Sequence, residues 1–229
     1  MRMPLSEQMR LLAQAELLEP LSKEQLENIA KHSPDVLYRQ GEILSTPHDL
    51  IEDVFYIIKK GRLRVYELSP QGREHTLAEI KSGTVFAATW LSEVYAQAMQ
   101  ETILVVLQRE DMKRLIQSNP EVGMRFIDLI FKRLRQSERR LADIALQQVP
   151  ARLANLILDL IEDEGIVTRE GYRLPISYTH ERLGTMIGAR RVTVTRALGD
   201  LRKSGAIEIE RRKIHVKDME TLKLIGGRR

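Results

Sequence analysis

The sequence contains no cysteine among its 229 residues. This absence excludes disulfide scaffolds, thiol catalysis, zinc fingers and cysteine-held iron–sulfur clusters. Apolar runs of membrane-spanning length are also missing, and the first ten residues, MRMPLSEQMR, lack the apolar core of a secretory signal. We therefore expect a cytoplasmic protein with no membrane association.

The motifs of common catalytic sites are also missing. The sequence has no G-x-S-x-G, no G-x-x-x-x-G-K, no Rossmann glycine pattern and no H-E-x-x-H. Its His, Asp and Glu residues show no metal-ligand spacing. We expect neither an enzyme nor a bound metal or other cofactor.

Positive charge is present but unevenly distributed. The chain has 36 Lys and Arg against 32 Asp and Glu, a formal net charge of +4. Within Arg182–Lys217, 10 basic residues stand against 3 acidic ones. A solvated charged face would explain this excess, but such a concentration is also typical of surfaces that bind polyphosphate.

The first half of the chain changes from helical to β-type patterns. Helical periodicity covers Ser6–Leu18, and Ser22 with Gln25 forms a capping box for a second short helix. Short β-prone runs then extend from Val36 to about Leu107, with single glycines at their turns: Gly41, Gly61, Gly72 and Gly83. This spacing predicts a small β-barrel or roll behind a helical preface.

A long central helix is predicted next. A short helix at Arg109–Ser118 is followed by Asn119 and Pro120, which suit an N-cap and a first helical position, and the pattern continues to about Gln147. Its seam positions repeat at heptad spacing: Ile127, Ile130, Leu134, Ser137, Leu141 and Ile144. The seam favours a homodimer over packing within one domain.

The last third predicts a second core and a DNA-binding motif. Thr179 caps a short helix that ends at Gly188, and a second helix runs from about Arg190 to Ser204, in the proportions of a helix-turn-helix. The segment AIEIERRKIHV then alternates like a β-hairpin wing. We therefore predict three parts: residues 1–118, 119–147 and 148–229.

Exposed cations on these elements would meet DNA. On the second helix, arginine can bond bidentately to guanine, while threonine and helix-end amides suit phosphates. In the wing, Arg211 and Lys213 are expected to contact phosphates and to weaken all sequences alike when removed. The expected contacts on the helix are Arg190, Arg191, Val192, Thr193 and Arg196.

These features together resemble the Crp–Fnr superfamily of bacterial transcription regulators. The stretch GARRVTVTR (Gly188–Arg196) is similar to the family's G-x-S-R-E-T-V-x-R recognition signature. The resemblance implies an α+β fold with an N-terminal cyclic-nucleotide-binding-like β-roll, a long dimerisation helix and a C-terminal winged helix-turn-helix. It also implies that the partners are double-stranded DNA, a second copy of the chain and RNA polymerase.

The resemblance also assigns roles to single residues. Arg191 and Arg196 match the family's base-contacting positions, Thr193 a phosphate or methyl contact, and His180, beside the Thr179 cap, a phosphate contact. Val192 replaces the family's Glu, and an isopropyl group cannot accept a hydrogen bond from cytosine N4. The family's standard half-site is therefore not expected.

The effector cassette departs further from the family pattern. Cyclic-AMP-binding members carry F-G-E-L and then an Arg-Ser pair, whereas this chain has GTVFAATWLSEVYAQAMQ. Glu for the ribose and Arg for the phosphate are both missing, so cyclic AMP is not expected to bind. The degenerate site comprises Phe86, Ala87, Ala88 and Trp90, with Ser137 offered from the seam. We expect Trp90 to pack inside the roll or to fill this site.

We therefore predict a dimeric, sequence-specific transcription regulator, an activator that is not controlled by cyclic AMP. Three alternatives stay open: a haem- or small-molecule-gated regulator of the same fold, a non-specific architectural DNA binder, and a regulatory module serving another protein. Haem would need an axial ligand such as His48, His75 or Met99. The C-terminal winged helix counts against the regulatory module.

Overall fold

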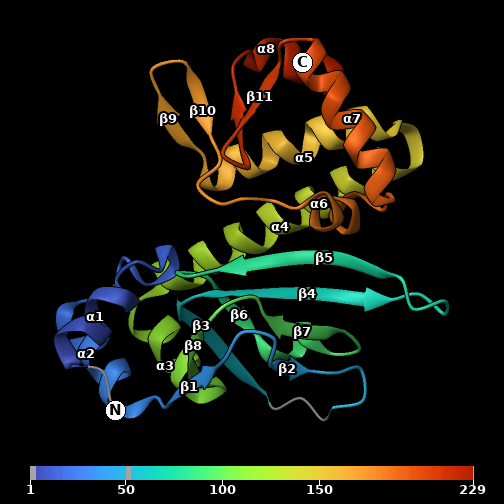
Figure 1. Ribbon diagram of the computed structural model, residues 1–229. Coiled ribbons are helices and arrows are strands. Elements are labelled where there is room, and N and C mark those ends of the chain that lie inside the picture. The colour runs from blue at the N-terminus through green and yellow to red at the C-terminus, as the bar shows by residue number, and fades with distance from the viewer. Residues whose placement is uncertain (1–3, 50–52, 229) are drawn as a thin grey trace. The chain divides into compact units, whose positions relative to one another are not determined.

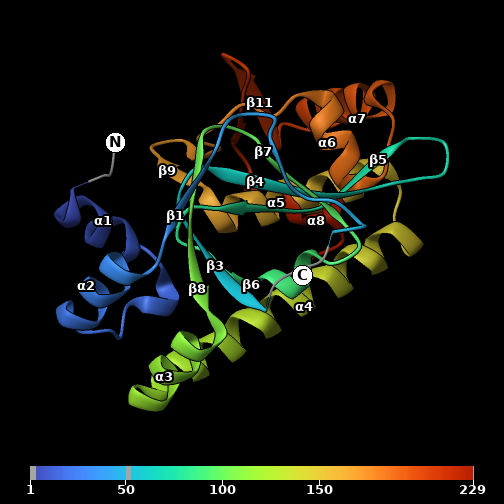
Figure 2. The same ribbon diagram turned by 90° about the horizontal axis from the view of Figure 1, so that it is seen from below.

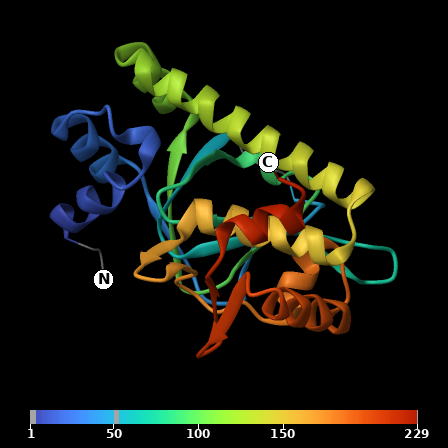
Figure 3. The same cartoon turned by 90° about the horizontal axis from the view of Figure 1, so that it is seen from above.

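The computed structural model describes residues 4–49 and 53–228 (Figure 1). It has two compact units, one extending to Arg133 and the other beginning at Leu134. The division lies inside α4 (Pro120–Leu146), which is one continuous helix (Figure 3). The three-part division at residues 118 and 147 stays a prediction.

The first unit contains two α-helices, a β-roll, two short 3₁₀ turns, a further helix and the start of α4. In chain order, its elements before α4 are α1 (Leu5–Leu12), η1 (Glu16–Leu18), α2 (Lys23–His32), β1 (Asp35–Tyr38), β2 (Ile43–Ser45), β3 (Val54–Lys60), β4 (Arg62–Leu68), β5 (Glu74–Lys81), β6 (Val85–Ala87), η2 (Ala88–Leu91), β7 (Tyr95–Ala98), β8 (Thr102–Gln108) and α3 (Arg109–Ser118).

The second unit contains the rest of α4, four further helices and a small sheet. Its elements after α4 are α5 (Val149–Glu164), β9 (Ile166–Thr168), β10 (Gly171–Arg173), α6 (His180–Ile187), α7 (Arg191–Lys203), β11 (Ile207–Glu210), β12 (Lys213–Val216) and α8 (Met219–Gly226). Within the described residues, no helix has both the length and the apolar character needed to cross a membrane.

The β-roll consists of two four-stranded antiparallel sheets, with strand orders β1-β8-β3-β6 and β2-β7-β4-β5 (Figure 2). Gly61 connects β3 to β4 with a φ of 99°, and a Cβ there would lie 2.4 Å from the Thr102 hydroxyl oxygen. The turn therefore requires glycine both for its backbone angle and for space. The predicted roll is confirmed.

Strand β3 differs from the expected alternation because both of its faces are covered. Ile58 lies in the apolar interior of the roll, whereas Ile57 packs with the N-terminal helices, α3 and the start of α4. Lys59 is also buried, so three successive side chains of β3 are excluded from solvent. A strand that is buried on both faces does not show a period of two.

The N-terminal helices form as the sequence indicates, with one correction. Both hydrogen bonds of the predicted capping box between Ser22 and Gln25 are present at the start of α2. A single helix over Ser6–Leu18 is wrong, because α1 ends at Leu12 and a 3₁₀ turn follows. That turn directs two consecutive leucines, Leu17 and Leu18, into the core, which one face of a continuous α-helix does not do.

A buried ion pair joins the helices to the roll. The side chain of Lys59 has no solvent exposure, and its Nζ lies 2.6 Å from Asp35 Oδ1 and 3.3 Å from Gln8 Oε1. Gln8 belongs to α1 and Asp35 to β1. The ammonium group is therefore compensated from two elements, which makes the docking of α1 specific.

The core of the second unit lies between α5, α6, α7, α8 and the small sheet. The sheet has strand order β11-β12-β10-β9, and its core residues include Leu153, Ile157, Leu198 and Val216. The second core predicted for the last third is present. Helix α5 contributes ten buried residues to the second unit, Ala151 and the nine residues 153–161, while Arg152 is half-buried. Strands β9 and β10 and helix α8 were not predicted, because they are short and have weak periodicity.

Replacing Asp35 by Ala should lower the free energy of unfolding of the first unit by about 3 kcal/mol, because the Lys59 charge stays buried without its partner. The control Lys59→Met removes the buried charge itself and should cost less. Urea unfolding followed by the fluorescence of Trp90, the single tryptophan, measures both. Equal losses in the two variants would contradict this role of the ion pair.

Candidate nucleic-acid interface

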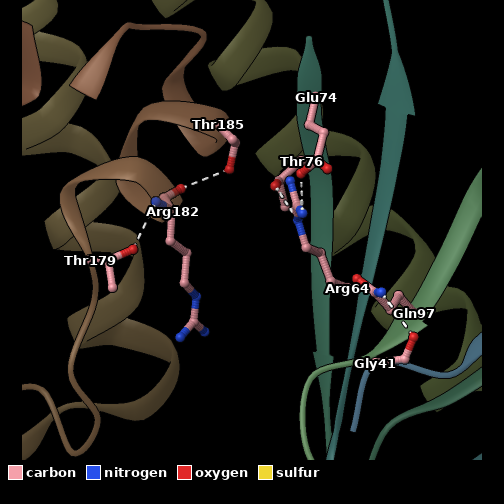
Figure 4. Close-up of polar contacts among 8 residues, drawn as sticks. All are labelled: Gly41, Arg64, Glu74, Thr76, Gln97, Thr179, Arg182 and Thr185. Carbon is pink, nitrogen blue, oxygen red and sulfur yellow. Dashed lines mark hydrogen bonds and ion pairs between the residues drawn. The ribbon is translucent and has the colours of Figure 1, made fainter. Parts of the chain in front are cut away.

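Helices α6 and α7 form the predicted helix-turn-helix. The Thr179 side chain caps α6 by accepting a hydrogen bond of 3.1 Å from the Arg182 backbone nitrogen, and the Thr185 hydroxyl donates to the Arg182 carbonyl (Figure 4). Gly188 ends α6 in the left-handed conformation, as predicted. Helix α7 begins at Arg191 rather than Arg190, because Arg190 has the extended backbone of an N-cap residue.

The turn between the two helices depends on a close backbone approach. A Cβ on Gly184 would lie 2.5 Å from the Ala189 carbonyl oxygen, and the Ala189 nitrogen donates a 2.9 Å hydrogen bond to the Gly184 carbonyl. The turn can therefore pass directly over α6 only because residue 184 has no side chain. This contact fixes where α7 starts.

Helix α7 has one buried and one exposed face. Val194, Ala197, Leu198 and Leu201 enter the core at helical spacing. The predicted DNA contacts lie on the other side, and Val192 is 63% exposed. The exposed residues in the first half of the helix are Arg191, Val192, Thr193, Thr195 and Arg196.

The charge around the start of α7 suits an anion. The first turn of α7 contains no acidic residue, although the partial positive charge at the N-terminus of a helix favours acidic side chains there. Among the described residues, no carboxylate forms an ion pair with Arg190, Arg191 or Arg196. The helix N-terminus and three guanidinium groups are therefore available to phosphates and bases.

Thr195 orients His180, and the sequence did not indicate this. Thr195 Oγ1 donates a 3.0 Å hydrogen bond to the Arg191 carbonyl and lies 2.8 Å from His180 Nδ1. Since the single hydroxyl hydrogen is already used, we assign the ring proton to Nδ1. Nε2 is then the ring nitrogen that is not engaged by Thr195. The spacing of four residues between Arg191 and Thr195 could have indicated the hydrogen bond to the Arg191 carbonyl, but not the contact with His180.

The predicted wing is present as the hairpin of β11 and β12. Ile207 pairs with Val216 and Glu210 with Lys213, so only Arg211 and Arg212 form the turn. Both arginines are exposed, whereas Lys213 is half-buried on its strand. The prediction named Arg211 and Lys213 but missed Arg212, although a two-residue turn between paired strands includes it.

A polar cluster joins the end of α4 to α5 and α8. The buried Asn155 amide donates 2.9 Å hydrogen bonds to Asp143 Oδ1 and to the Gly226 carbonyl, while Arg228 donates to Asp159 Oδ1 at 2.7 Å. Burial raises the pKa of the Asp143 carboxyl, and the hydrogen bond from Asn155 and the charge of Arg228 oppose this rise. The cluster fixes the C-terminal end of α4 within the second unit.

The predicted dimer seam is exposed in the single chain. Its apolar side chains are between 45% and 69% exposed, and Ser137 is exposed among them. Such a long apolar stripe on one helix is a candidate for burial by another surface. The exposed apolar residues are Ile127, Ile130, Leu134, Leu141 and Ile144.

The effector cassette differs from the expectation at Trp90. Phe86 and Ala88 are buried in the roll, but Trp90 is 38% exposed and lies outside its core. Its ring contacts Phe86 edge-on at 6.0 Å and stacks against the Arg133 guanidinium of α4 at 3.9 Å. Interior packing of Trp90 is therefore wrong: Leu91 takes the buried position of this turn. Ser137 belongs to the second unit.

Other polar residues of the roll connect strands to one another. Arg64 Nε donates to Thr76 Oγ1 at 2.8 Å, its guanidinium also contacts Glu74 and Tyr66, and Gln97 donates to the Gly41 carbonyl (Figure 4). Within residues 4–49 and 53–228, no three His, Asp or Glu side chains cluster as metal ligands would.

Three glycine substitutions test the backbone geometry of the helix-turn-helix, two at the turn and one within α7. Gly184→Ala should lower the stability of the second unit by about 1–3 kcal/mol, because its Cβ would overlap the Ala189 carbonyl. Gly188→Ala has open space but a left-handed backbone and should cost about 1 kcal/mol. Gly199→Ala, in open space within α7, should gain about 0.5–1 kcal/mol. Calorimetric unfolding measures this order, and any other order would contradict the geometry.

Comparison with known proteins finds a family match for one segment in each half of the chain. Residues 35–119 match the cyclic nucleotide-binding domain, and residues 151–225 match the Crp-like helix-turn-helix domain. The Global nitrogen regulator of Nostoc sp. is 28% identical over 192 residues, which cover 81% of this chain and 86% of that protein. The CRP-like cAMP-activated global transcriptional regulator of Mycobacterium tuberculosis is 29% identical over 177 residues, 74% and 78% of the two chains.

Solved structures share the fold. A CooA variant from Carboxydothermus hydrogenoformans has a TM-score of 0.79 at 24% identity, covering 96% of this chain and 99% of that chain. FixK2 from Bradyrhizobium japonicum has a TM-score of 0.70 at 19% identity, covering 84% and 96%. With the two domains matched in this order, the chain belongs to the Crp–Fnr superfamily and is a transcription regulator with a helix-turn-helix DNA-binding domain.

Proposed function

We propose that this regulator binds an imperfectly palindromic DNA site as a homodimer, activates transcription by contacting RNA polymerase, and does not respond to cyclic AMP. The observation that carries the DNA-binding part is the exposed face of α7. Its arginines have no carboxylate partner among the described residues, while its opposite face is anchored in the core.

Each residue of this face has a role that follows from its chemistry. The guanidinium groups of Arg191 and Arg196 donate to guanine O6 and N7 in the major groove. Val192 offers apolar contact to a thymine methyl group, and Thr193 with the α7 amides binds phosphate. Arg190 and Lys213 add phosphate contacts, which strengthen binding to every sequence, and His180 Nε2 adds one when both ring nitrogens carry a proton.

Dimerisation through α4 supplies the symmetry of the operator. Two copies paired along the exposed seam would place two α7 helices in successive major grooves, so half-sites should lie about 34 Å apart. The seam residues repeat at heptad spacing. Because their apolar side chains are exposed in the single chain, a second copy of the helix could bury them.

Independence from cyclic AMP rests on the missing charges of the cassette. Ala87 and Ala88 stand where cyclic-AMP-binding members carry Gly and Glu, and no Arg occurs between Arg73 and Arg109. The Mycobacterium tuberculosis relative is described as cAMP-activated. A cyclic phosphate in this cassette would lose its hydration without gaining the Arg contact that the family's cassette supplies, which is unfavourable.

The recognition helix is tested by Arg191→Ala and Val192→Glu. Arg191→Ala should cost about 1–3 kcal/mol per half-site and relax the preference at one base pair, and Val192→Glu should shift a neighbouring preference toward cytosine. Binding-site selection from a random DNA library measures both. An unchanged profile for Arg191→Ala would show that α7 does not recognise bases, and a wild type with no preferred site would support the architectural alternative.

The dimer seam is tested by Leu134→Glu combined with Leu141→Glu. Two carboxylates in an apolar interface should cost several kcal/mol, so sedimentation should show monomers. Glu substitutions at Arg135 and Arg139, which are exposed on the same helix but outside the seam, are the matched control and should leave the dimer intact. A dimeric double seam variant would mean that the seam is assigned wrongly.

Cyclic AMP should neither raise the melting temperature nor increase operator affinity, since a ligand that prefers the DNA-binding state must do both. Titration calorimetry with cyclic AMP is expected to show no saturable heat at micromolar concentrations. Saturable binding that strengthens the operator complex would refute this part of the proposal.

A further inference from the structure

The tip of the wing has an unusual backbone. Arg211 and Arg212 are the only turn residues between paired Glu210 and Lys213, and their φ angles are 47° and 63°. Positive φ at both central positions matches the tight hairpin turn that strongly prefers Asn-Gly or Gly-Gly. Arginine has a Cβ that makes this conformation unfavourable. The residue types therefore oppose the local backbone preference at two consecutive positions.

The two arginines do not stabilise the wing through ion pairs. Glu208 lies 3.4 Å from Lys217 Nζ and Glu210 lies 3.8 Å from His215 Nε2, so the wing's carboxylates lie against side chains other than the two arginines. Within the described part of the chain, no carboxylate forms an ion pair with Arg211 or Arg212. Both side chains are exposed at the point of the hairpin farthest from the core. Strained backbone at two exposed residues without an ion pair in the fold points to a role outside the fold.

We propose that Arg211 and Arg212 recognise a narrow minor groove next to each half-site, so that the protein prefers A-tract sequences there without contacting base edges in the major groove. This inference rests on the proposed binding of α7 in the major groove, since a wing beside that helix meets the adjacent groove. For Arg211 it replaces the uniform phosphate contact expected from the sequence, which is kept for Lys213. Narrow minor grooves of A-tracts have an enhanced negative potential that attracts arginine. The guanidinium group is more weakly hydrated than the lysine ammonium, which favours its entry into a groove.

Lys213 differs from the two tip residues and supplies the matched control. It lies on β12, paired with Glu210, and its backbone is regular. A lysine at this place acts as a point charge on phosphates, and its effect should not depend on groove width. We therefore expect the tip residues to contribute an affinity that depends on the flanking sequence, and Lys213 to contribute an affinity that is the same for all flanks.

The experiment is a binding-site selection in which the half-sites are fixed and the spacer and flanks are random. The wild type should enrich A-tracts at one set distance from each half-site. Arg211→Asn combined with Arg212→Gly supplies the preferred turn residues, so it should fold with an equal or higher melting temperature. Its preference for A-tract over G·C flanks should fall by roughly threefold to tenfold, with an unchanged half-site profile. Lys213→Ala should weaken binding to all flanks alike.

Inosine separates recognition of the minor groove from recognition of base edges in the major groove. I·C pairs lack the minor-groove amino group of G·C but keep the G·C pattern in the major groove. At the enriched position, I·C flanks should bind like A·T flanks. The inference is overturned if I·C flanks bind like G·C flanks, or if the double variant keeps the wild-type flank ratio. A wild type that selects half-sites but no flank overturns this inference alone, whereas one that selects no half-site overturns the proposed function with it.

Discussion

The contact between Gly184 and the Ala189 carbonyl is the constraint on which the DNA-binding unit depends. Because residue 184 has no side chain, the chain crosses α6 within three residues and begins α7 at Arg191. The start of α7 fixes which of its residues enter the core and which stay exposed. The missing side chain at residue 184 therefore allows α7 to begin at Arg191, and the packing of the α7 core residues keeps Arg191 and Arg196 on the exposed face of the helix.

Much of the fold could be predicted because its signals are local. The capping box at Ser22, the cap at Thr179 and the ending of α6 at Gly188 each depend on side-chain or backbone chemistry within four residues. The break after Leu12 and the burial of Lys59 could not be predicted in the same way. Both depend on a second layer of helices that covers β3, and this layer is brought there by residues far away in the sequence.

The same distinction applies to the candidate site. The exposed residues of α7 follow from helical spacing around Val194 and Leu198, so the sequence identifies them. The contact of Thr195 with His180 joins two helices, and the stacking of Trp90 on Arg133 joins a turn of the roll to α4. Contacts of this kind follow from tertiary packing and leave no periodic pattern. In the cassette, the exposed face of Trp90 is therefore occupied by a cation–π contact with the long helix.

The positive φ angles of the wing tip have a consequence for how this sequence changes over time. With the role proposed for Arg211 and Arg212, selection for stability would favour small residues at these positions of positive φ, while selection for DNA contact would retain arginine. A lineage whose target promoters no longer differed in flanking sequence would lose only the second pressure, and its turn would drift toward Asn and Gly. The residue types at these two positions should therefore depend on whether the target promoters differ in their flanking sequences.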